Sequence, residues 1–172
     1  MRPVINFLIL FCLILLLISC GKTGGPPVIG ETAANFRLNT LDHERFYLNQ
    51  NKGKVVVLIF WATWCRACKT EMVVLQNFTA LPGWQDVTVA AVCTDPENLS
   101  DVKSIVRNLK ISYPVLLDHN ARLFQKFQLT LYPTTLIIDQ RQRLSFIRVG
   151  YDPAIMNRIK SKVISLARSD SP

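Results

Sequence analysis

The stretch Val55-Val-Val-Leu-Ile-Phe-Trp61, continued by Ala-Thr-Trp-Cys65-Arg-Ala-Cys68, decides the fold of this chain. Residues 55–61 are apolar and rich in β-branched side chains, which is typical of a central strand buried on both faces of a sheet. The residues that follow have helical periodicity and predict a helix over residues 65–81. A buried strand that leads through a cysteine pair into a helix indicates an α/β fold.

The rest of the chain alternates between strand and helix patterns in the same way. Asp152 followed by Pro153 is a strong start signal for a last helix. The other patterns predict a hairpin from residues 36–38 and 46–48, strands at 87–93, 115–117, 134–138 and 144–149, and helices at 98–109 and 121–127. This order predicts a mixed sheet with helices on both faces.

Length and composition limit the class of protein. The chain has 172 residues, of which 49% are hydrophobic, so it is long enough for one domain with a buried core, and wholesale disorder is excluded. The net charge is +8, but the chain has no nucleic-acid-binding motif and no run of five Lys or Arg residues. We therefore expect a solvated basic face on a monomer and no nucleic-acid partner.

The N-terminus has the pattern of an export signal. Arg2 precedes an apolar run over residues 7–18, which is shorter than the roughly 20 residues that span a bilayer. The sequence Leu17-Ile18-Ser19-Cys20 then resembles a bacterial lipobox, whose cysteine is acylated and becomes the new N-terminus. The alternative is an uncleaved anchor with Cys20 as a plain thiol. We expect a signal peptide over residues 1–19, a lipid-anchored flexible tether over 20–30 and a domain over 31–172, which faces the periplasm or extracytoplasmic side on the inner or outer membrane.

The spacing of Cys65 and Cys68 points to redox chemistry. Backbone N–H groups at a helix N-terminus stabilise an anion, so the first thiol ionises near neutral pH, and Arg66 adds a positive charge beside it. Cys68 lies one turn along the helix, close enough to close a disulfide. We expect Cys65 to attack a substrate and Cys68 to resolve the mixed disulfide.

Two other interpretations of the cysteine pair are weaker. A structural zinc site needs four ligands, and the remaining candidates, Cys93, His43 and His119, are scattered without a second motif. We therefore expect no metal. A purely structural disulfide would close so short a loop that it would restrict the unfolded chain little. Cys93 continues the apolar face of its strand and is expected to be an inert buried thiol.

Two segments resemble the thioredoxin superfamily. Val55 to Cys65, continued to Glu71, is similar to its active-site strand and helix, and Tyr132-Pro133-Thr-Thr-Leu-Ile-Ile-Asp139 is similar to its cis-proline segment. The chain is most similar to the TlpA/ResA-like membrane-anchored thiol–disulfide oxidoreductases. The resemblance covers about residues 36–166. It implies a thioredoxin fold with an N-terminal β-hairpin and a central αβ insertion, and it implies no cofactor.

The resemblance also implies roles for several residues near the cysteines. Pro133 is expected in the cis form against the dithiol, with the backbone of Tyr132 pairing with an extended substrate segment. Trp64 is expected to shield the disulfide, or else to pack in the core. Glu71 lies three residues after Cys68 on the same side of the helix, where related proteins carry a glutamate implicated in thiol acid–base chemistry. Its alternative role is that of a solvated surface residue.

The function expected from these features is reduction of protein disulfides. The resemblance implies electrons from a membrane reductase, with apocytochrome c haem sites or copper-site proteins as substrates. A peroxiredoxin-like peroxidase is an alternative, but the sequence before Cys65 lacks the Pro-x-x-x-Thr-x-x-Cys setting. A non-enzymatic copper-delivery protein is another, but that class usually shows CxxxC and a distal histidine.

Overall fold

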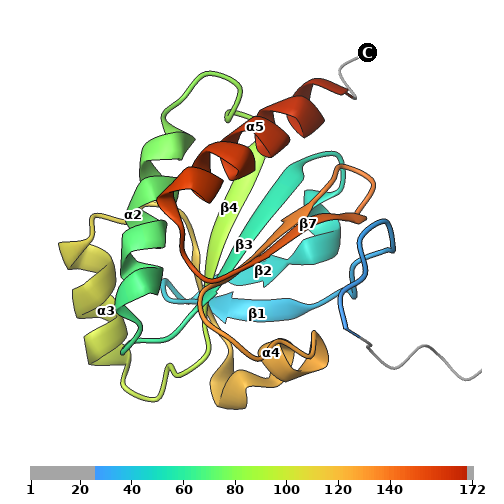
Figure 1. Cartoon of the computed structure of the whole chain (residues 1–172). Helices are drawn as coiled ribbons and strands as arrows, with labels where there is room; N and C mark the ends of the chain where they lie inside the picture. Colours follow the sequence, from blue (N-terminus) through green and yellow to red (C-terminus); the bar gives the residue numbers. More distant parts are fainter. Residues whose placement is uncertain (1–25, 170–172) are drawn as a thin grey trace, which may run out of the picture.

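A seven-stranded mixed sheet runs through the protein in the order β2-β1-β5-β4-β3-β6-β7 (Figure 1). The computed structural model describes residues 26–169. Strands β3, β4 and β5 are parallel, and all other neighbouring pairs are antiparallel. The bounds of the strands are β1 Arg37–Thr40, β2 Arg45–Tyr47, β3 Val55–Trp61, β4 Val87–Cys93, β5 Val115–Leu117, β6 Thr134–Ile138 and β7 Leu144–Val149.

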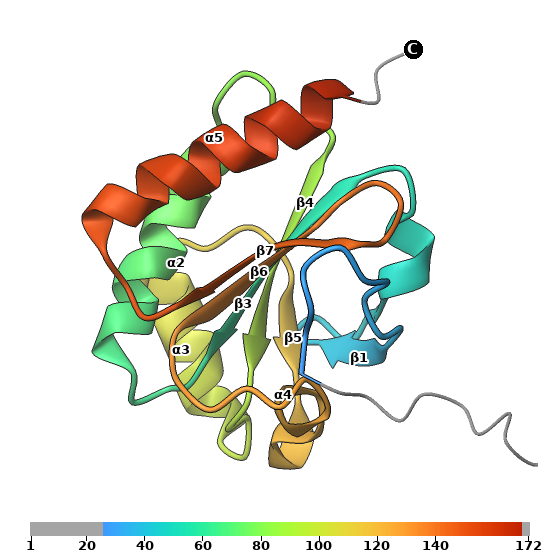
Figure 2. The same ribbon diagram turned by 45° about the vertical axis from the view of Figure 1, so that its right-hand side comes forward.

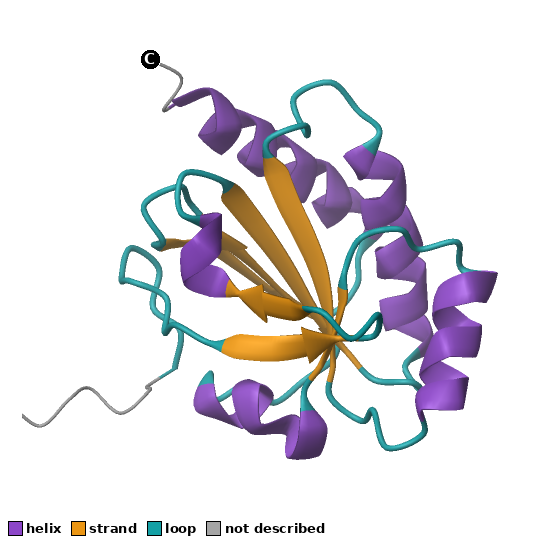
Figure 3. Ribbon diagram, turned by 180° about the vertical axis from the view of Figure 1, so that it is seen from behind, coloured by secondary structure: helices purple, strands orange, loops and turns teal. Residues whose placement is uncertain are grey.

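Helices cover both faces of this sheet. One face packs against α2 (Arg66–Thr79), α3 (Leu99–Asn108) and α5 (Pro153–Ser169), and the opposite face packs against the short α4 (Arg122–Lys126) (Figures 2 and 3). Strand β3 separates the two cores. Its alternating side chains contribute to one core through Val57 and Ile59 and to the other through Leu58 and Phe60. This two-sided burial explains the continuous apolar run in the sequence.

The expected α/β architecture is confirmed, including the thioredoxin fold with its hairpin and αβ insertion. The hairpin differs in one detail, because Leu48 does not end its second strand. Leu48 instead begins a 3-10 turn, η1 (Leu48–Asn51), and is fully buried beneath the sheet. A second 3-10 turn, η2 (His119–Ala121), precedes α4. Asp152 caps α5 as expected, with Oδ1 accepting from the N–H of Ala154 at 2.9 Å.

The parallel strands place their carboxyl ends at one edge of the sheet. The chain leaves β3 at Trp61, β4 at Cys93 and β5 at Leu117, so the residues that follow these strands lie at the same end of the molecule. The leader and Cys20 lie outside the described residues. No helix within residues 26–169 is long and apolar enough to cross a membrane.

Candidate active site

Cys65 and Cys68 form a disulfide at the start of α2. Cys65 is the N-cap residue of the helix, and its Sγ accepts a hydrogen bond from the backbone N–H of Cys68 at 3.1 Å. Cys65 is 5% exposed and Cys68 is fully buried. The structure therefore brings together the two expected cysteines and leaves only the first open to solvent, at the end of the helix where an anion is stabilised.

The loop before β6 contains the expected cis peptide bond between Tyr132 and Pro133. Two contacts fix this loop. The Tyr132 hydroxyl is hydrogen-bonded to Thr94 Oγ1 at 2.8 Å, and the backbone N–H of Gly150 donates to the Pro133 carbonyl at 2.7 Å. Gly150 has a φ of 76°, a left-handed conformation that glycine adopts without strain. The sequence analysis did not single out Gly150, although a glycine directly after a predicted strand indicates a turn.

Apolar side chains surround the entrance to the disulfide. Trp64 is 70% exposed and Leu131 is 61% exposed, so Trp64 does not pack in the core. The Trp64 ring contacts the Tyr132 ring edge to face, with centroids 5.6 Å apart. Tyr132 stacks in turn on Phe124 of α4, with centroids 4.6 Å apart. Arg66 is exposed.

Glu71 is buried rather than solvated. It is 1% exposed on α2, one turn after Cys68, and one of its carboxylate oxygens accepts a short hydrogen bond from the hydroxyl of Thr135 on β6. Burial raises the pKa of Glu71 to about 7, although the Thr135 hydrogen bond and the positive charge of Arg148 act in the opposite direction. A carboxyl group with this pKa exchanges a proton readily at neutral pH.

Asp95 is a residue of the site that the sequence analysis missed. It follows β4 and holds the turn between β3 and the cysteines, because its carboxylate accepts from the Thr63 N–H at 2.9 and 3.0 Å and from the Thr63 hydroxyl at 2.7 Å. The neighbouring Thr94 donates its N–H to the Trp61 carbonyl at 3.0 Å. The available signal in the sequence was an acidic residue two positions after the end of a buried strand.

The third cysteine of the domain, Cys93, is unpaired and buried. Its thiol lies 3.4 Å from Asp95 Oδ1, and burial raises its pKa far above the ordinary range. Such a thiol does not ionise at neutral pH, which agrees with the expectation of an inert group. Within residues 26–169 no cluster of three or more His, Cys, Asp or Glu side chains could hold a metal ion.

Solved structures share this fold. A thiol:disulfide interchange protein of the thioredoxin family from Chlorobium tepidum TLS superposes with a TM-score of 0.69, at 24% identity over 83% of this chain and 97% of that chain. StoA from Bacillus subtilis superposes with a TM-score of 0.64, at 23% identity over 75% of this chain and 96% of that chain. Together with the cysteine pair, the fold defines a thioredoxin-like oxidoreductase.

Sequence relatives give the family. The profile described as the AhpC/TSA family matches residues 29–147, and the chain belongs to that family. Thioredoxin-like protein YneN of Bacillus subtilis strain 168 is 32% identical over 122 residues, which cover 70% of this chain and 71% of YneN. Thiol-disulfide oxidoreductase ResA of Bacillus thuringiensis subsp. konkukian is 29% identical over 143 residues, which cover 77% of this chain and 82% of ResA. The protein is a thiol–disulfide oxidoreductase of this type.

Proposed function

We propose that the protein is a lipid-anchored reductant of protein disulfides outside the cytoplasm. The observation that carries this proposal is the Cys65–Cys68 disulfide at the N-terminus of α2, in which Cys65 keeps 5% of its surface exposed while Cys68 is fully buried. This asymmetry supports different roles for the two cysteines. A slightly exposed cysteine at a helix N-terminus suits attack on a partner, and a fully buried cysteine one turn away suits resolution.

In the first step the reduced protein attacks its substrate. The Cys65 thiolate forms a bond to one sulfur of the substrate disulfide, the substrate S–S bond breaks, and the other substrate sulfur leaves as a thiolate. The hydrogen bond from the Cys68 N–H to Cys65 Sγ stabilises the negative charge on Cys65 before attack. The product is a mixed disulfide between Cys65 and the substrate.

In the second step Cys68 resolves the mixed disulfide. The Cys68 thiol gives its proton to the Glu71 carboxylate and attacks Cys65 Sγ, which releases the second substrate thiolate. The raised pKa of Glu71, about 7, supports this role because the carboxyl can take up the proton and later return it to solvent or product. The substrate gains two electrons, and the protein ends with the Cys65–Cys68 disulfide. A membrane dithiol reductase would restore the two electrons.

The substrate is a protein with an accessible disulfide. The exposed side chains of Trp64 and Leu131 and the half-buried ring of Tyr132 supply apolar contacts near the disulfide. In the cis-proline loop the backbone of Tyr132 would pair with an extended substrate segment. Apocytochrome c haem sites and copper-site proteins of oxidase assembly are the substrates that the family resemblance favours, and the protein acts on them as a monomer.

A trapping experiment tests the exchange mechanism. In Cys68→Ser the mixed disulfide at Cys65 cannot resolve, so substrate proteins should accumulate as adducts that dithiothreitol releases. The control Cys65→Ser/Cys68→Ser should trap nothing. Adducts that form equally with Cys65→Ser alone would contradict the assigned order of attack. Peroxide turnover by the wild type that exceeds disulfide turnover would favour the peroxiredoxin-like alternative, and stoichiometric copper binding by the reduced protein would favour copper delivery.

Removal of the acylated residue tests the anchor. Cys20→Ala should abolish incorporation of radiolabelled lipid and release or mislocalise the protein, whereas the matched change Cys12→Ala in the leader should do neither. Normal labelling and anchoring of Cys20→Ala would show that residues 1–19 are not a lipoprotein signal peptide.

A further inference from the structure

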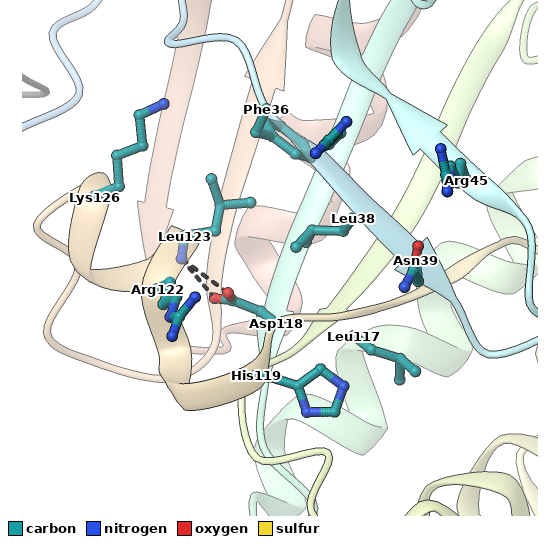
Figure 4. A pocket seen from close by; sticks show the side chains of 11 residues that line it. Phe36, Leu38, Asn39, Arg45, Leu117, Asp118, His119, Arg122, Leu123 and Lys126 are labelled. Carbon is teal, nitrogen blue, oxygen red and sulfur yellow. Dashed lines mark hydrogen bonds between the residues drawn. The ribbon is translucent and has the colours of Figure 1, made fainter.

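A basic pocket lies at the β2-β1 edge of the sheet. It has a volume of about 570 Å³ and is bounded by the β1–β2 hairpin, the end of β5 and α4 (Figure 4). Its cationic side chains are Arg37, Arg45, Arg122 and Lys126, and His119 also lines it. Neither the disulfide nor the cis-proline loop contributes to it, so the mechanism above does not account for this concentration of charge.

Secondary structure concentrates the cations on the pocket. Asn39 and Arg45 are cross-strand partners, and Arg37 lies two residues before Asn39, so both arginines extend from the same face of the hairpin. That face is opposite to the one that carries Leu38 and Phe46, which belong to the core beside α4. On the other side, Arg122 and Lys126 lie one turn apart on α4 and therefore share a face of that helix. Figure 4 shows the side chains of Arg122 and Lys126 across the pocket from that of Arg45.

The single acid of the pocket does not neutralise these cations. Asp118 is buried, and its carboxylate accepts from the backbone N–H of Leu123 at 2.8 and 3.0 Å and of Phe124 at 3.0 Å. These hydrogen bonds use the Asp118 carboxylate to stabilise the start of α4. Within residues 26–169 the guanidinium groups of Arg37, Arg45 and Arg122 make no ion pair. The pocket thus keeps an excess of positive charge and of guanidinium N–H donors, which are the groups that bind oxyanions.

The N-terminal arm of the domain leads directly to this pocket. Lys126 Nζ donates to the backbone carbonyl of Asn35 at 3.0 Å, and the next residue, Phe36, lines the pocket. In Figures 1 and 2 the described chain begins beside β1 and α4. From Cys20 to Pro26 the chain reaches at most about 20 Å. A lipid on Cys20 would therefore keep the pocket within reach of the membrane surface.

We propose that this pocket binds the phosphate of an anionic phospholipid headgroup in the membrane that holds the protein. The proposal rests on the proposed lipid anchor. Phosphate suits the pocket because arginine binds its oxygens through two parallel N–H donors, and each basic side chain at an anionic surface contributes attraction that decays within a Debye length. Binding would hold the hairpin and α4 against the headgroups.

Arginine footprinting of the full chain in vesicles tests the proposal. The protein is placed in vesicles of phosphatidylcholine, with or without phosphatidylglycerol, and treated with phenylglyoxal before mass spectrometry. On the anionic vesicles we expect modification of Arg37, Arg45 and Arg122 to slow at least about fivefold. This factor corresponds to about 1 kcal/mol, the attraction of one basic side chain to an anionic membrane surface. The exposed Arg107 and Arg158, which lie on α3 and α5, should react equally on both vesicles.

Matched variants and a soluble probe complete the test. The stabilisation of the chain on anionic vesicles, measured as a rise in Tm, should be lost in Arg37→Gln/Arg122→Gln and kept in Arg107→Gln/Arg158→Gln, which removes the same charge. Equal protection of all arginines, or protection by soluble glycerol phosphate but not by the anionic vesicles, would overturn the proposal. Flotation with both vesicles and disulfide turnover are measured in parallel, so a failed anchor or a failed oxidoreductase is distinguished from a failed pocket.

Discussion

The carboxylate of Asp95 holds both polar groups of Thr63, although the two residues are 32 positions apart in the sequence. Thr63 lies in the turn that carries Cys65, so this contact fixes the nucleophile relative to the end of β4. Asp95→Asn replaces one acceptor oxygen by an amide donor. We expect it to lower the free energy of unfolding of the oxidised protein by about 1–3 kcal/mol.

Chemical denaturation and alkylation together check this expectation. Asp86→Asn, an exposed change at the start of β4, is the matched control and should leave stability within about 0.5 kcal/mol. Thr63→Val combined with Asp95→Asn should cost less than the sum of the two single changes, because both remove the same contact. Asp95→Asn should also alter the rate of Cys65 alkylation. Additive losses and an unchanged alkylation rate would argue against positioning of Cys65 by this pair.

Glu71 should make the stability of the oxidised protein depend on pH. Its pKa is about 7 in the folded protein against an ordinary value of 4.5, so the folded state holds the proton more tightly. The free energy of unfolding contributed by this group is therefore fully present below pH 4.5 and is lost as pH rises to about 7, by about 3 kcal/mol. Glu71→Gln should lose this dependence and gain relative stability at pH 8.

The same substitution tests proton transfer in the reduced protein. Glu71→Gln removes a negative charge near the dithiol, so the thiol pKa should fall, and resolution of the mixed disulfide should slow because no carboxylate accepts the Cys68 proton. Thiolate absorbance against pH and turnover of a small disulfide measure the two effects. Glu44→Gln on the exposed hairpin is the control. Identical titrations and rates for Glu71→Gln and wild type would show that water, and not Glu71, accepts the proton from Cys68.

Alkylation at neutral pH should distinguish the three cysteines of the reduced domain. Cys65 should react first, because it is the accessible sulfur at the helix N-terminus, and Cys68 should follow slowly. Cys93 should react only on unfolding, since its thiol is buried and its pKa is raised. Mass spectrometry of peptides after timed exposure to iodoacetamide gives the order. Early modification of Cys68 or Cys93 would refute the assignment.

Trp64→Ala should slow the reduction of protein disulfides but not that of small disulfides. The Trp64 side chain is mostly exposed, so its loss should change stability by no more than about 0.5 kcal/mol. Reduction of a protein disulfide should slow several-fold through KM, because the apolar contact surface is lost, whereas turnover of a small disulfide should not change. The exposed Ile29→Ala, away from the cysteines, should affect neither rate. Parallel losses on both substrates would assign Trp64 a role in the chemistry itself.

The sequence predicts most of this fold because the decisive patterns are local. The bounds of β3 and β6 follow from apolar runs that end at polar turns, and the N-cap of α5 follows from Asp152 and Pro153. The sequence places Leu48 at the end of a strand, whereas it begins a 3-10 turn. A buried leucine suits either element, so the side chain alone does not distinguish them.

Contacts between distant segments were harder to predict. The pairing of Thr63 with Asp95 joins residues that only the parallel order of β3 and β4 brings together. The basic pocket likewise collects cations from the hairpin and from α4, which are separated by most of the domain. The cysteine pair and Pro133 were predictable because family motifs carry them, whereas the burial of Glu71 depends on how closely β6 packs against α2.

The placement of the tryptophans gives the protein an internal optical probe. The chain has three tryptophans, and two of them, Trp61 and Trp84, are buried, whereas Trp64 is exposed beside the disulfide. Long-wavelength emission, which arises from water-exposed indole, therefore comes from Trp64 alone. Trp64 directly precedes Cys65, so we expect the intensity of this emission to change with the redox state of Cys65 and Cys68. A blue shift would report a substrate covering the ring, so both events are visible by fluorescence in the unlabelled wild-type chain.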